Sequence, residues 1–530
     1  MAKISSLSLV RNPEIDASAP SIEMLRERVQ SAVAEALCVV QTQATGPAVT
    51  YREVERAIRE AVLGVGRALL VLFLGLREAH VMAEHHAKHQ GRYQGLTRSF
   101  RVAPPIARSF TTWFGVVRYH RTYLRQCGHG ERHGFHPLDV SLGLNQDRFS
   151  WNVLMVAARL ATKMAFAEAK LTLGSFVPDA PSTEVIEKTV LGLGNHAADF
   201  VEQAPAPSDD GDVLVVLFDG KGAPTVTERE LARRRKKHSK HGACSSRRHR
   251  GRQRRSRHPR QPRRNKGDKS KNAKMATMVV MYTLRRVGTR RLEGPINVRH
   301  YASFAPKRHA FEVARRLADK RGFRCDSGKL VQVLTDGDRD LAQLCVEFFP
   351  DAEHTVDFYH VLEYVHVAGE CLLREGSQEL AKWFDEQRQR LLDDQAEHVV
   401  HELRAQLAAI SKTGPGNKGR RERLEKALLY IERRLPNIRY GALRRRDLEI
   451  GTGAVEGAVK RIIGRRCDHG GMRWIRERVE AVVQLRCIEI NGQWDHFEAF
   501  VHERLHLHAV VLEEPQRLQT SHPAPLPEAA

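Results

Sequence analysis

The chain lacks paired cysteines and long apolar runs. Its eight cysteines in 530 residues include no Cys-x-x-Cys pair, which disfavours a disulfide framework and is typical of a reducing cytoplasm. The most apolar run, residues 68–76, is flanked by Arg67 and Arg77. A membrane-spanning helix needs about 20 apolar residues, so this run predicts a buried helix instead. The N-terminus also lacks a signal-peptide pattern. We therefore expect a cytoplasmic protein that does not bind membranes.

One segment almost lacks acidic side chains and has no aromatic ones. Residues 233–274 hold 20 lysines and arginines, the single acid Asp268, and no Phe, Trp or Tyr. The segment carries most of the chain's net charge of +23, so the rest is nearly neutral. Such a cluster binds phosphates through counterion release, with affinity that falls as salt rises, but it cannot stack on bases. We expect it to bind nucleic acid without sequence choice; a disordered loop that binds any polyanion, RNA included, fits the same composition. The candidate DNA-binding residues are Lys221, Arg233, Arg234, Arg235, Lys236, Lys237, Arg247, Arg248, Arg254, Arg255, Arg263 and Arg264.

Composition and periodicity divide the chain into seven segments. Alternating β-branched and aromatic residues predict a β-hairpin around Gly115, and helical spacing predicts helices before it. Two further helices are expected, one near 161–173 and one to about 191 that begins at Ser182, a candidate N-cap. They form either a helix-turn-helix or two core helices. An α/β pattern follows, with strands at 213–218, 276–286, 291–299, 330–335 and 353–357 and helices at 306–321 and 338–348. The expected segments are a helical region (1–103), a small β element (104–145), a helical DNA-binding region (146–200), an α/β domain (211–359, with a basic loop at 229–274), an all-α insertion (360–449), the rest of the α/β domain (450–500) and a tail (501–530) whose end we expect to be disordered.

Two aspartates each follow an apolar, strand-like run. Asp219 follows residues 213–218, and Asp336 follows residues 330–335. Ligand sites in α/β sheets lie beyond the carboxyl ends of strands. A third carboxylate, Glu456, lies in a short helical segment. Carboxylates suit Mg²⁺ or Mn²⁺, and two such ions about 3.5–4 Å apart can serve phosphoryl transfer. The pattern therefore predicts a two-metal catalytic site of Asp219, Asp336 and Glu456.

Each of these acids also has an ordinary explanation. Asp-Gly pairs after strands are common turn residues, and Glu456 fits the solvated face of a helix. Asp338 and Asp340 compete with Asp336, which we prefer because it lies nearest the strand end. The combination of two strand-end aspartates with a helical glutamate favours the site.

Three further residues are candidates for supporting roles. Asp357 and His360 lie three apart where a strand becomes a helix; the alternative is a helix cap with a surface histidine. Lys460 lies four residues after Glu456, on the same helix face. It is placed either to hold a DNA phosphate or to form an ordinary ion pair.

The motifs around these residues occur together in one known family. The motifs are Asp219-Gly220-Lys221-Gly222, Thr335-Asp336-Gly337, Asp357-Phe358-Tyr359-His360-Val361 and Gly451-Thr452-Gly453-Ala454-Val455-Glu456-Gly457-Ala458-Val459-Lys460, followed by Met472-Arg473-Trp474 and Asn491-Gly492-Gln493-Trp494. In this order they resemble bacterial insertion-sequence transposases of the ISKra type, over residues 105 to 500. Those transposases belong to the DDE class.

The resemblance implies a ribonuclease-H-like catalytic core interrupted by an all-α insertion and preceded by helical and small β DNA-binding regions. The family's two aspartates and glutamate map to Asp219, Asp336 and Glu456, and its Asp-x-x-His element maps to Asp357 and His360. Relatives often carry a zinc-ribbon-like element near residues 125–130. Here the four possible ligands are irregularly spaced, so we do not expect zinc; they are Cys127, His129, His133 and His136.

The expected function is transposition of an insertion sequence: metal-dependent nicking of its ends and joining of the 3′-OH to target DNA. Both steps are displacements at phosphorus that one two-metal site can perform. Two DNA ends must be held together, so we expect at least a homodimer, associated with the bacterial nucleoid. Alternatives are a ribonuclease-H-like nuclease without strand transfer, a DNA- or RNA-binding protein with a decayed site, and a basic architectural protein.

Overall fold

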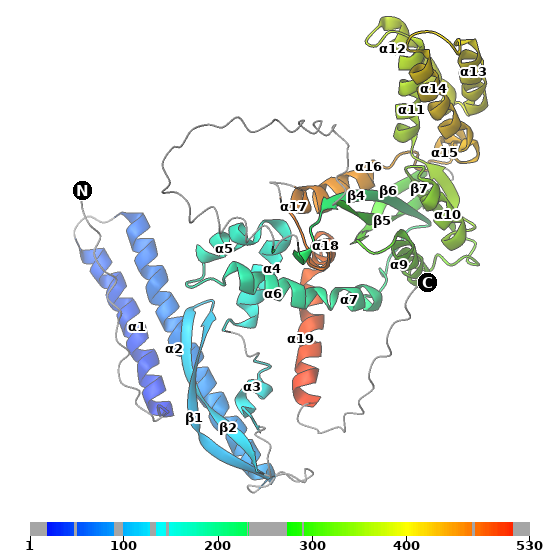
Figure 1. Cartoon of the computed structure of the whole chain (residues 1–530). Coiled ribbons are helices and arrows are strands. Elements are labelled where there is room, and N and C mark those ends of the chain that lie inside the picture. Colours follow the sequence, from blue (N-terminus) through cyan, green and yellow to red (C-terminus); the bar gives the residue numbers. More distant parts are fainter. Residues whose placement is uncertain are drawn as a thin grey trace. The chain divides into compact units, whose positions relative to one another are not determined.

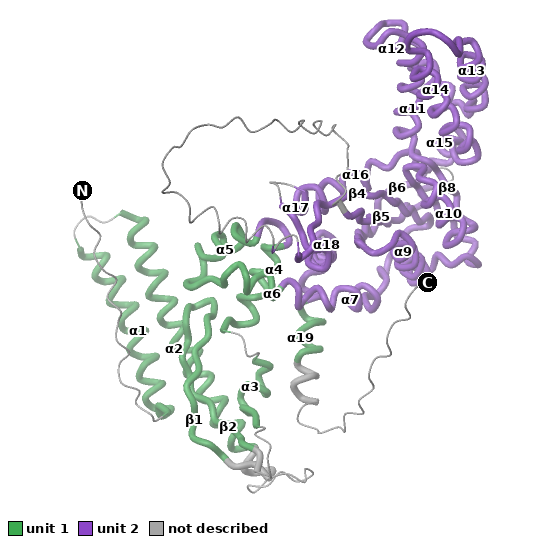
Figure 2. Tube along the Cα trace, viewed as in Figure 1, with its two compact units in different colours: residues 1–161, 166–189, 498–530 green, residues 162–165, 190–497 purple. Residues whose placement is uncertain are grey.

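A computed structural model describes residues 19–46, 50–89, 99–127, 134–144, 148–229, 232, 273–288, 291–468 and 472–511. The chain forms two compact units, which Figure 2 shows in separate colours. Unit 1 comprises residues 1–161, 166–189 and 498–530. Unit 2 comprises residues 162–165 and 190–497.

Unit 1 combines two long helices with a β-hairpin. Helix α1 (Ile22–Thr45) packs against α2 (Tyr51–His89), and α2 packs against strand β2 (Gly115–Cys127). Strand β1 (Ser99–Thr112) pairs antiparallel with β2. The turn between them includes Gly115, whose φ of +103° favours glycine. The small core beneath the hairpin consists of Leu74, Phe110, Val117, Tyr119 and Leu138.

The next elements are short. Strand β3 (Gly134–Phe135) pairs with β2 and is followed by α3 (Pro137–Ser141). Three helices come after it: α4 (Trp151–Lys163), α5 (Phe166–Gly174) and α6 (Thr183–Gly194). The Val185 N–H donates to the Ser182 hydroxyl at 3.3 Å, so the predicted N-cap at Ser182 is confirmed. The predicted helix around 161–173 was wrong in one respect, because it breaks between Lys163 and Phe166.

Unit 2 is built on a five-stranded mixed sheet in the order β6-β5-β4-β7-β8. The first three strands pair antiparallel, and β7 and β8 continue the sheet in parallel with β4. Their bounds are β4 (Val213–Pro224), β5 (Ala273–Val287), β6 (Arg291–Ser303), β7 (Leu330–Thr335) and β8 (Glu353–Val356).

The core of unit 2 lies on one face of this sheet. Helices α9 (Lys307–Lys320) and α10 (Arg339–Phe348) pack there through an apolar cluster. At its centre the rings of Phe218 and Phe311 stack with centroids 3.7 Å apart. Residues 213–218 are buried on both faces, which suits a central strand. The continuous apolar run that predicted this strand therefore reflects burial from both sides.

A block of helices separates β8 from the last part of unit 2. Figure 1 shows its four longer helices side by side as a bundle, coloured green to yellow. The block comprises α11 (Phe358–Leu372), α12 (Gln378–Leu392), α13 (Ala396–Ala409), α14 (Asn417–Glu432), the 3₁₀ turn η1 (Leu435–Asn437) and α15 (Tyr440–Arg445). The predicted helical stretch from His360 to about Leu435 is confirmed, and it consists of four helices.

The remaining helices of unit 2 cover other parts of the sheet. Helix α16 (Gly453–Val459) continues through the π-helical turn η2 (Lys460–Gly464) into α17 (Arg465–Cys467) and packs on β4 and β5. Helices α7 (Ala197–Gln203) and α18 (Arg476–Ile490) also belong to unit 2, whereas most of α19 (Trp494–Val511), from Glu498 onward, belongs to unit 1. No helix in the described ranges is long and apolar enough to cross a membrane.

The predicted order of strands and helices in this mixed α/β domain is confirmed, with two corrections to its limits. Strand β4 does not end at Phe218, because β5 keeps pairing with it from Asp219 as far as Pro224. The predicted basic loop extends to residue 274, but Ala273 and Lys274 belong to β5. The predicted hairpin around Gly115 is also confirmed. The tail after Val511 lies outside the described residues.

A buried ion pair ties the start of β4 to the end of α9. Arg321 donates to Asp210 at 2.7 Å, and only 4% of its side chain is exposed. Burial alone would raise the pKa of Asp210, but hydrogen bonds from Arg321, Thr283 and Asn297 lower it to about 2. The carboxylate therefore contributes stability above the ordinary carboxyl pKa of about 4. That stability is lost as the pH falls toward 2.

We predict that Asp210→Asn lowers the free energy of unfolding by about 3 kcal/mol at neutral pH, since it leaves a buried arginine without its charge partner. Urea unfolding followed by tryptophan fluorescence, from neutral pH down to pH 3, would measure the difference in free energy of unfolding between wild type and variant. This difference should become smaller as the pH falls. Asp209→Asn is the matched control, because Asp209 pairs with Arg285 at the surface. Equal losses in the two variants would contradict the prediction.

Candidate carboxylate site

The parallel pairing of β4 with β7 brings Asp219 and Asp336 to the same level of the sheet. The last pair in register is Leu217 with Leu334, and each aspartate follows two residues later on its own chain segment. Alternate strand residues point to the same face, so Asp219 faces away from the core around Phe218. Asp336 continues the same register one residue beyond β7. Asp219 therefore lies beyond the end of its parallel neighbour, although not at the end of its own strand.

The backbone of the Asp336 turn is held by the helical block. The Tyr430 hydroxyl, at the end of α14, donates to the Asp336 carbonyl at 2.7 Å, and Arg434 donates to the Gly337 carbonyl at 2.9 Å. Gly337 has a φ of +80°, and a Cβ there would lie 2.6 Å from both the Tyr430 hydroxyl and Arg434 Nε. The guanidinium of Arg434 lies over the Tyr430 ring, and Tyr430 stacks on Tyr364 of α11. The insertion thus fixes the second aspartate's turn.

Glu456 lies on α16, whose start is anchored by Asp357. The Asp357 carboxylate is fully buried; it accepts the Thr452 N–H at 3.1 Å and the Thr452 hydroxyl at 2.8 Å. It also caps α11 by accepting the Tyr359 N–H. The Glu456 N–H donates to the Thr452 carbonyl at 3.0 Å, in the first turn of α16. Asp357 is therefore a helix cap that also positions the helix carrying Glu456.

A buried glutamine ties the segment before α16 to the same face of the sheet. Gln332 of β7 exchanges two hydrogen bonds with the backbone of Glu449, at 2.7 and 3.1 Å. It shares a strand face with Leu334, and thus with the level at which Asp336 emerges. The segment that leads to Glu456 is consequently fixed on the strand next to β4.

The carboxylates affect one another electrostatically. Burial raises the pKa of Asp219 above its ordinary value, and the charges of Asp336 and Glu456 raise it further. The Gly220 N–H, which donates to Asp219 at 2.6 Å, and the nearby His360 side chain lower this pKa. The fold therefore brings Asp336, His360 and Glu456 from distant parts of the chain near Asp219. Mutual repulsion at such a place favours bound cations.

Among the described residues, no group of three or more His, Cys, Asp or Glu side chains is arranged to hold a metal ion. The donor types nevertheless suit Mg²⁺ or Mn²⁺. The Glu456 side chain is 43% exposed, so it has room to turn toward the aspartates. A metal ion would have to draw these side chains together.

The competing acids have other roles. Asp338 is the N-cap of α10, accepting the N–H groups of Asp340 and Leu341, and it pairs with Lys307 at 2.9 Å. Asp340 is exposed and also lies near Lys307. The Asp336 carboxylate instead accepts a local hydrogen bond, from the Asp338 N–H at 2.9 Å. These contacts favour Asp336 as the site residue.

The supporting candidates Lys460 and His360 and the DNA-binding candidate Lys221 are all at least partly exposed. Lys460 is 75% exposed and forms an ion pair with Glu456 at 3.3 Å, which leaves its ammonium group accessible. His360 lies 3.4 Å from Glu363 and is about one-third exposed. Lys221 shares a strand face with Asp219, and its ammonium lies 4.0 Å from Asp468.

Several predicted residues lie outside the described part of the chain. They are the candidate DNA-binding residues Arg233, Arg234, Arg235, Lys236, Lys237, Arg247, Arg248, Arg254, Arg255, Arg263 and Arg264, and the candidate zinc ligands His129 and His133. The side chain of Cys127 is also not described. His136 is described, and its Nδ1 hydrogen-bonds to the Thr122 carbonyl at 2.8 Å.

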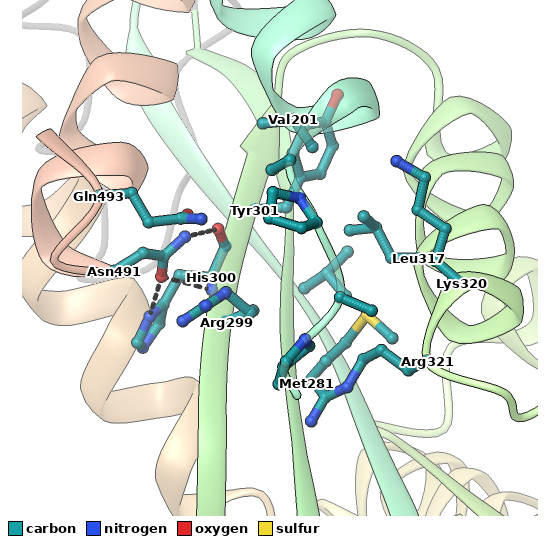
Figure 3. A pocket seen from close by; sticks show the side chains of 15 residues that line it. Val201, Met281, Arg299, His300, Tyr301, Leu317, Lys320, Arg321, Asn491 and Gln493 are labelled. Atoms are coloured by element: carbon teal, nitrogen blue, oxygen red, sulfur yellow. Dashed lines mark hydrogen bonds between the residues drawn. The ribbon is translucent and has the colours of Figure 1, made fainter. Parts of the chain in front are cut away.

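A separate pocket lies at the β6 edge of the sheet (Figure 3). Its volume is about 60 Å³, and none of the three site carboxylates lines it. Asn491, from the C-terminal motif, accepts the His300 N–H at 2.8 Å and donates to the His300 carbonyl at 3.0 Å. In the same way the Trp474 indole is buried and donates to the Cys467 carbonyl. These motif residues hold elements together.

Comparison with known proteins adds no family assignment. No protein-family model matches the chain, and no curated protein matches it.

The sequence analysis did not identify the positioning residues Thr452, Tyr430 and Arg434. The one available signal was Gln332, a polar residue inside an otherwise apolar strand run.

We predict that Thr452→Val lowers the free energy of unfolding of unit 2 by about 1–3 kcal/mol, because it leaves one oxygen of the buried Asp357 carboxylate without a donor. Urea unfolding at neutral pH would measure the loss. Thr413→Val, at an exposed position of the helical block, is the control and should change little. A Thr452 variant as stable as the control would show that the contact contributes nothing.

A second prediction concerns the charge of the site. Asp336→Asn should lower the pKa of Asp219 because it removes one of the negative charges that raise it. Carboxyl-carbon NMR of aspartate-labelled protein during an acid titration would measure this pKa. Asp340→Asn, which removes an exposed acid at the second position of α10, should leave the pKa of Asp219 unchanged. An unchanged pKa in Asp336→Asn would mean that the two aspartates do not share a site.

Proposed function

We propose that this chain is a DNA transposase of the DDE class, with Asp219, Asp336 and Glu456 as its catalytic and metal-binding residues. The observation that carries the proposal is the common register of Asp219 and Asp336 on adjacent parallel strand segments, with the charge of Glu456 acting on the same carboxylate. The motifs that resemble insertion-sequence transposases of the ISKra type surround these same residues.

The topology of unit 2 supports a ribonuclease-H-like core. Three antiparallel strands are followed by α9, by β7 in parallel with β4, and by α10 and β8. The all-α insertion then lies between β8 and the helix that carries Glu456. Both long separations in the chain, between the aspartates and before the glutamate, are insertions between core elements.

Each site residue has a distinct part in the proposed reaction. Two divalent ions held by the carboxylates would supply activation of water, and later of a 3′-OH, for in-line attack at phosphorus. Strand register holds Asp219, while Tyr430 and Arg434 hold the turn of Asp336. Glu456, anchored through Thr452, keeps the freedom to close on the bound ions.

The placement of the basic segment supports DNA as the substrate. The segment begins after β4 and ends at β5. Pro224 at the end of β4 pairs with Ala273 at the start of β5, and this pair lies five residues beyond Asp219 along β4. A polycation attached there concentrates phosphate near the carboxylates. Lys221 and the exposed Lys460 add positive charge close by.

The test uses labelled DNA from the sequences that flank the gene, with Mg²⁺ or Mn²⁺, and measures nicking and strand joining. The wild-type chain should produce 3′-end nicks and joined products. Asp219→Asn, Asp336→Asn and Glu456→Gln should each reduce both to background while DNA binding persists. Asp340→Asn is the matched control and should retain both activities.

The alternatives predict other results. Nicking without joined products would indicate a nuclease of the same fold. DNA binding without cleavage in the wild-type chain, under either metal, would favour a binding protein whose site has decayed and would overturn the catalytic assignment.

A further inference from the structure

The middle of helix α2 is apolar on nearly every side. Residues 61–76 contain one charged side chain, Arg67. One side of the helix packs on α1, where the Cβ position of Gly75 meets Leu25 and Ile22. Another side packs on the β-hairpin through Leu74. A helix that is apolar all round is normally buried all round, so its third side is anomalous.

That third side is exposed. It is formed by Ile58, Val62, Leu69, Phe73 and Leu76, whose exposed fractions run from 37% to 56%. From Ile58 to Leu76 the row spans 19 residues, and its two ends lie about 27 Å apart at the rise of an α-helix. A row of this length is more than the scattered apolar residues that any surface carries.

Helix α1 adds a second exposed row, formed by Val33, Leu37 and Val40. On both helices the exposed row lies one residue after a row of half-buried residues, such as Ala32 and Ala36 on α1. The two helices run antiparallel and are related by an approximate two-fold axis perpendicular to their plane. Equal offsets therefore turn both rows to the same side, where they form one apolar face.

The charges around this face indicate what covers it. Residues 22–84 hold eight glutamates and seven arginines, in contrast to the polycationic segment. A nearly neutral apolar surface does not suit nucleic acid, whose binding requires excess positive charge. Mixed charges of both signs do not repel an identical surface, and a pair of antiparallel helices packs well on its two-fold mate as a four-helix bundle.

We propose that a second copy of this chain binds to the apolar face of the α1–α2 hairpin, and that the two hairpins form a four-helix bundle. The inference concerns unit 1 and does not rest on the proposed catalytic function. The proposal places the expected dimer contact on a surface where protein binds protein and no DNA takes part.

The experiment is sedimentation velocity of the full-length chain over a range of concentrations. Nuclease treatment and high salt remove nucleic acid that could bridge the basic segments. The wild-type chain should sediment as a dimer, at twice its mass of 60.0 kDa. The double variant Leu69→Glu/Phe73→Glu should sediment as a monomer with unchanged far-ultraviolet circular dichroism.

Two further variants separate this face from general surface effects. Leu37→Glu, on the α1 row, should weaken the dimer independently of any change in α2. Leu171→Glu, at a position of α5 that is 73% exposed, is the control and should leave the dimer intact. A monomeric wild-type chain would overturn the proposal and indicate that other segments of the same chain cover the face. A dimer that persists in folded Leu69→Glu/Phe73→Glu and Leu37→Glu variants would also overturn it.

Discussion

The parallel register between β4 and β7 is the constraint on which the candidate site depends. It places Asp219 and Asp336 at one level although 117 positions separate them, the same offset as between Leu217 and Leu334. A shift of one residue in this pairing would turn one strand's side chains to the opposite face and separate the carboxylates. The buried side chain of Gln332 in β7 opposes such a slip, because it would lose its hydrogen bonds to Thr355 and to the Glu449 carbonyl.

The helical insertion is joined to this site by more than chain connectivity. Tyr430 and Arg434 bind the backbone of the Asp336 turn, and burial raises the pKa of Tyr430, so its hydroxyl keeps the proton that it donates. Asp357 performs a similar task on the other side, because one buried carboxylate both starts α11 and anchors the segment leading to Glu456. The block thus begins and ends at contacts that hold two of the three carboxylates.

The two units have different surface chemistry. In unit 2 the basic segment joins strand ends that lie beyond Asp219, and the proposed function assigns it phosphate binding without sequence choice. In unit 1 the α1–α2 hairpin is almost neutral and has an apolar face. Nucleic-acid binding and self-association would then use separate surfaces, so that salt weakens the first much more than the second.

The sequence by itself determined the order of elements in the α/β domain, the hairpin at Gly115 and the identity of the candidate acids. These features depend on local periodicity and on residues next to them in the chain, such as an apolar run before an aspartate. It could not show that β4 continues past Asp219, because that extension comes from pairing with β5. Nor could it choose among Asp336, Asp338 and Asp340 by their partners, or assign roles to Tyr430, Arg434 and Thr452. Those contacts join residues about 95 positions apart, so tertiary packing alone decided them.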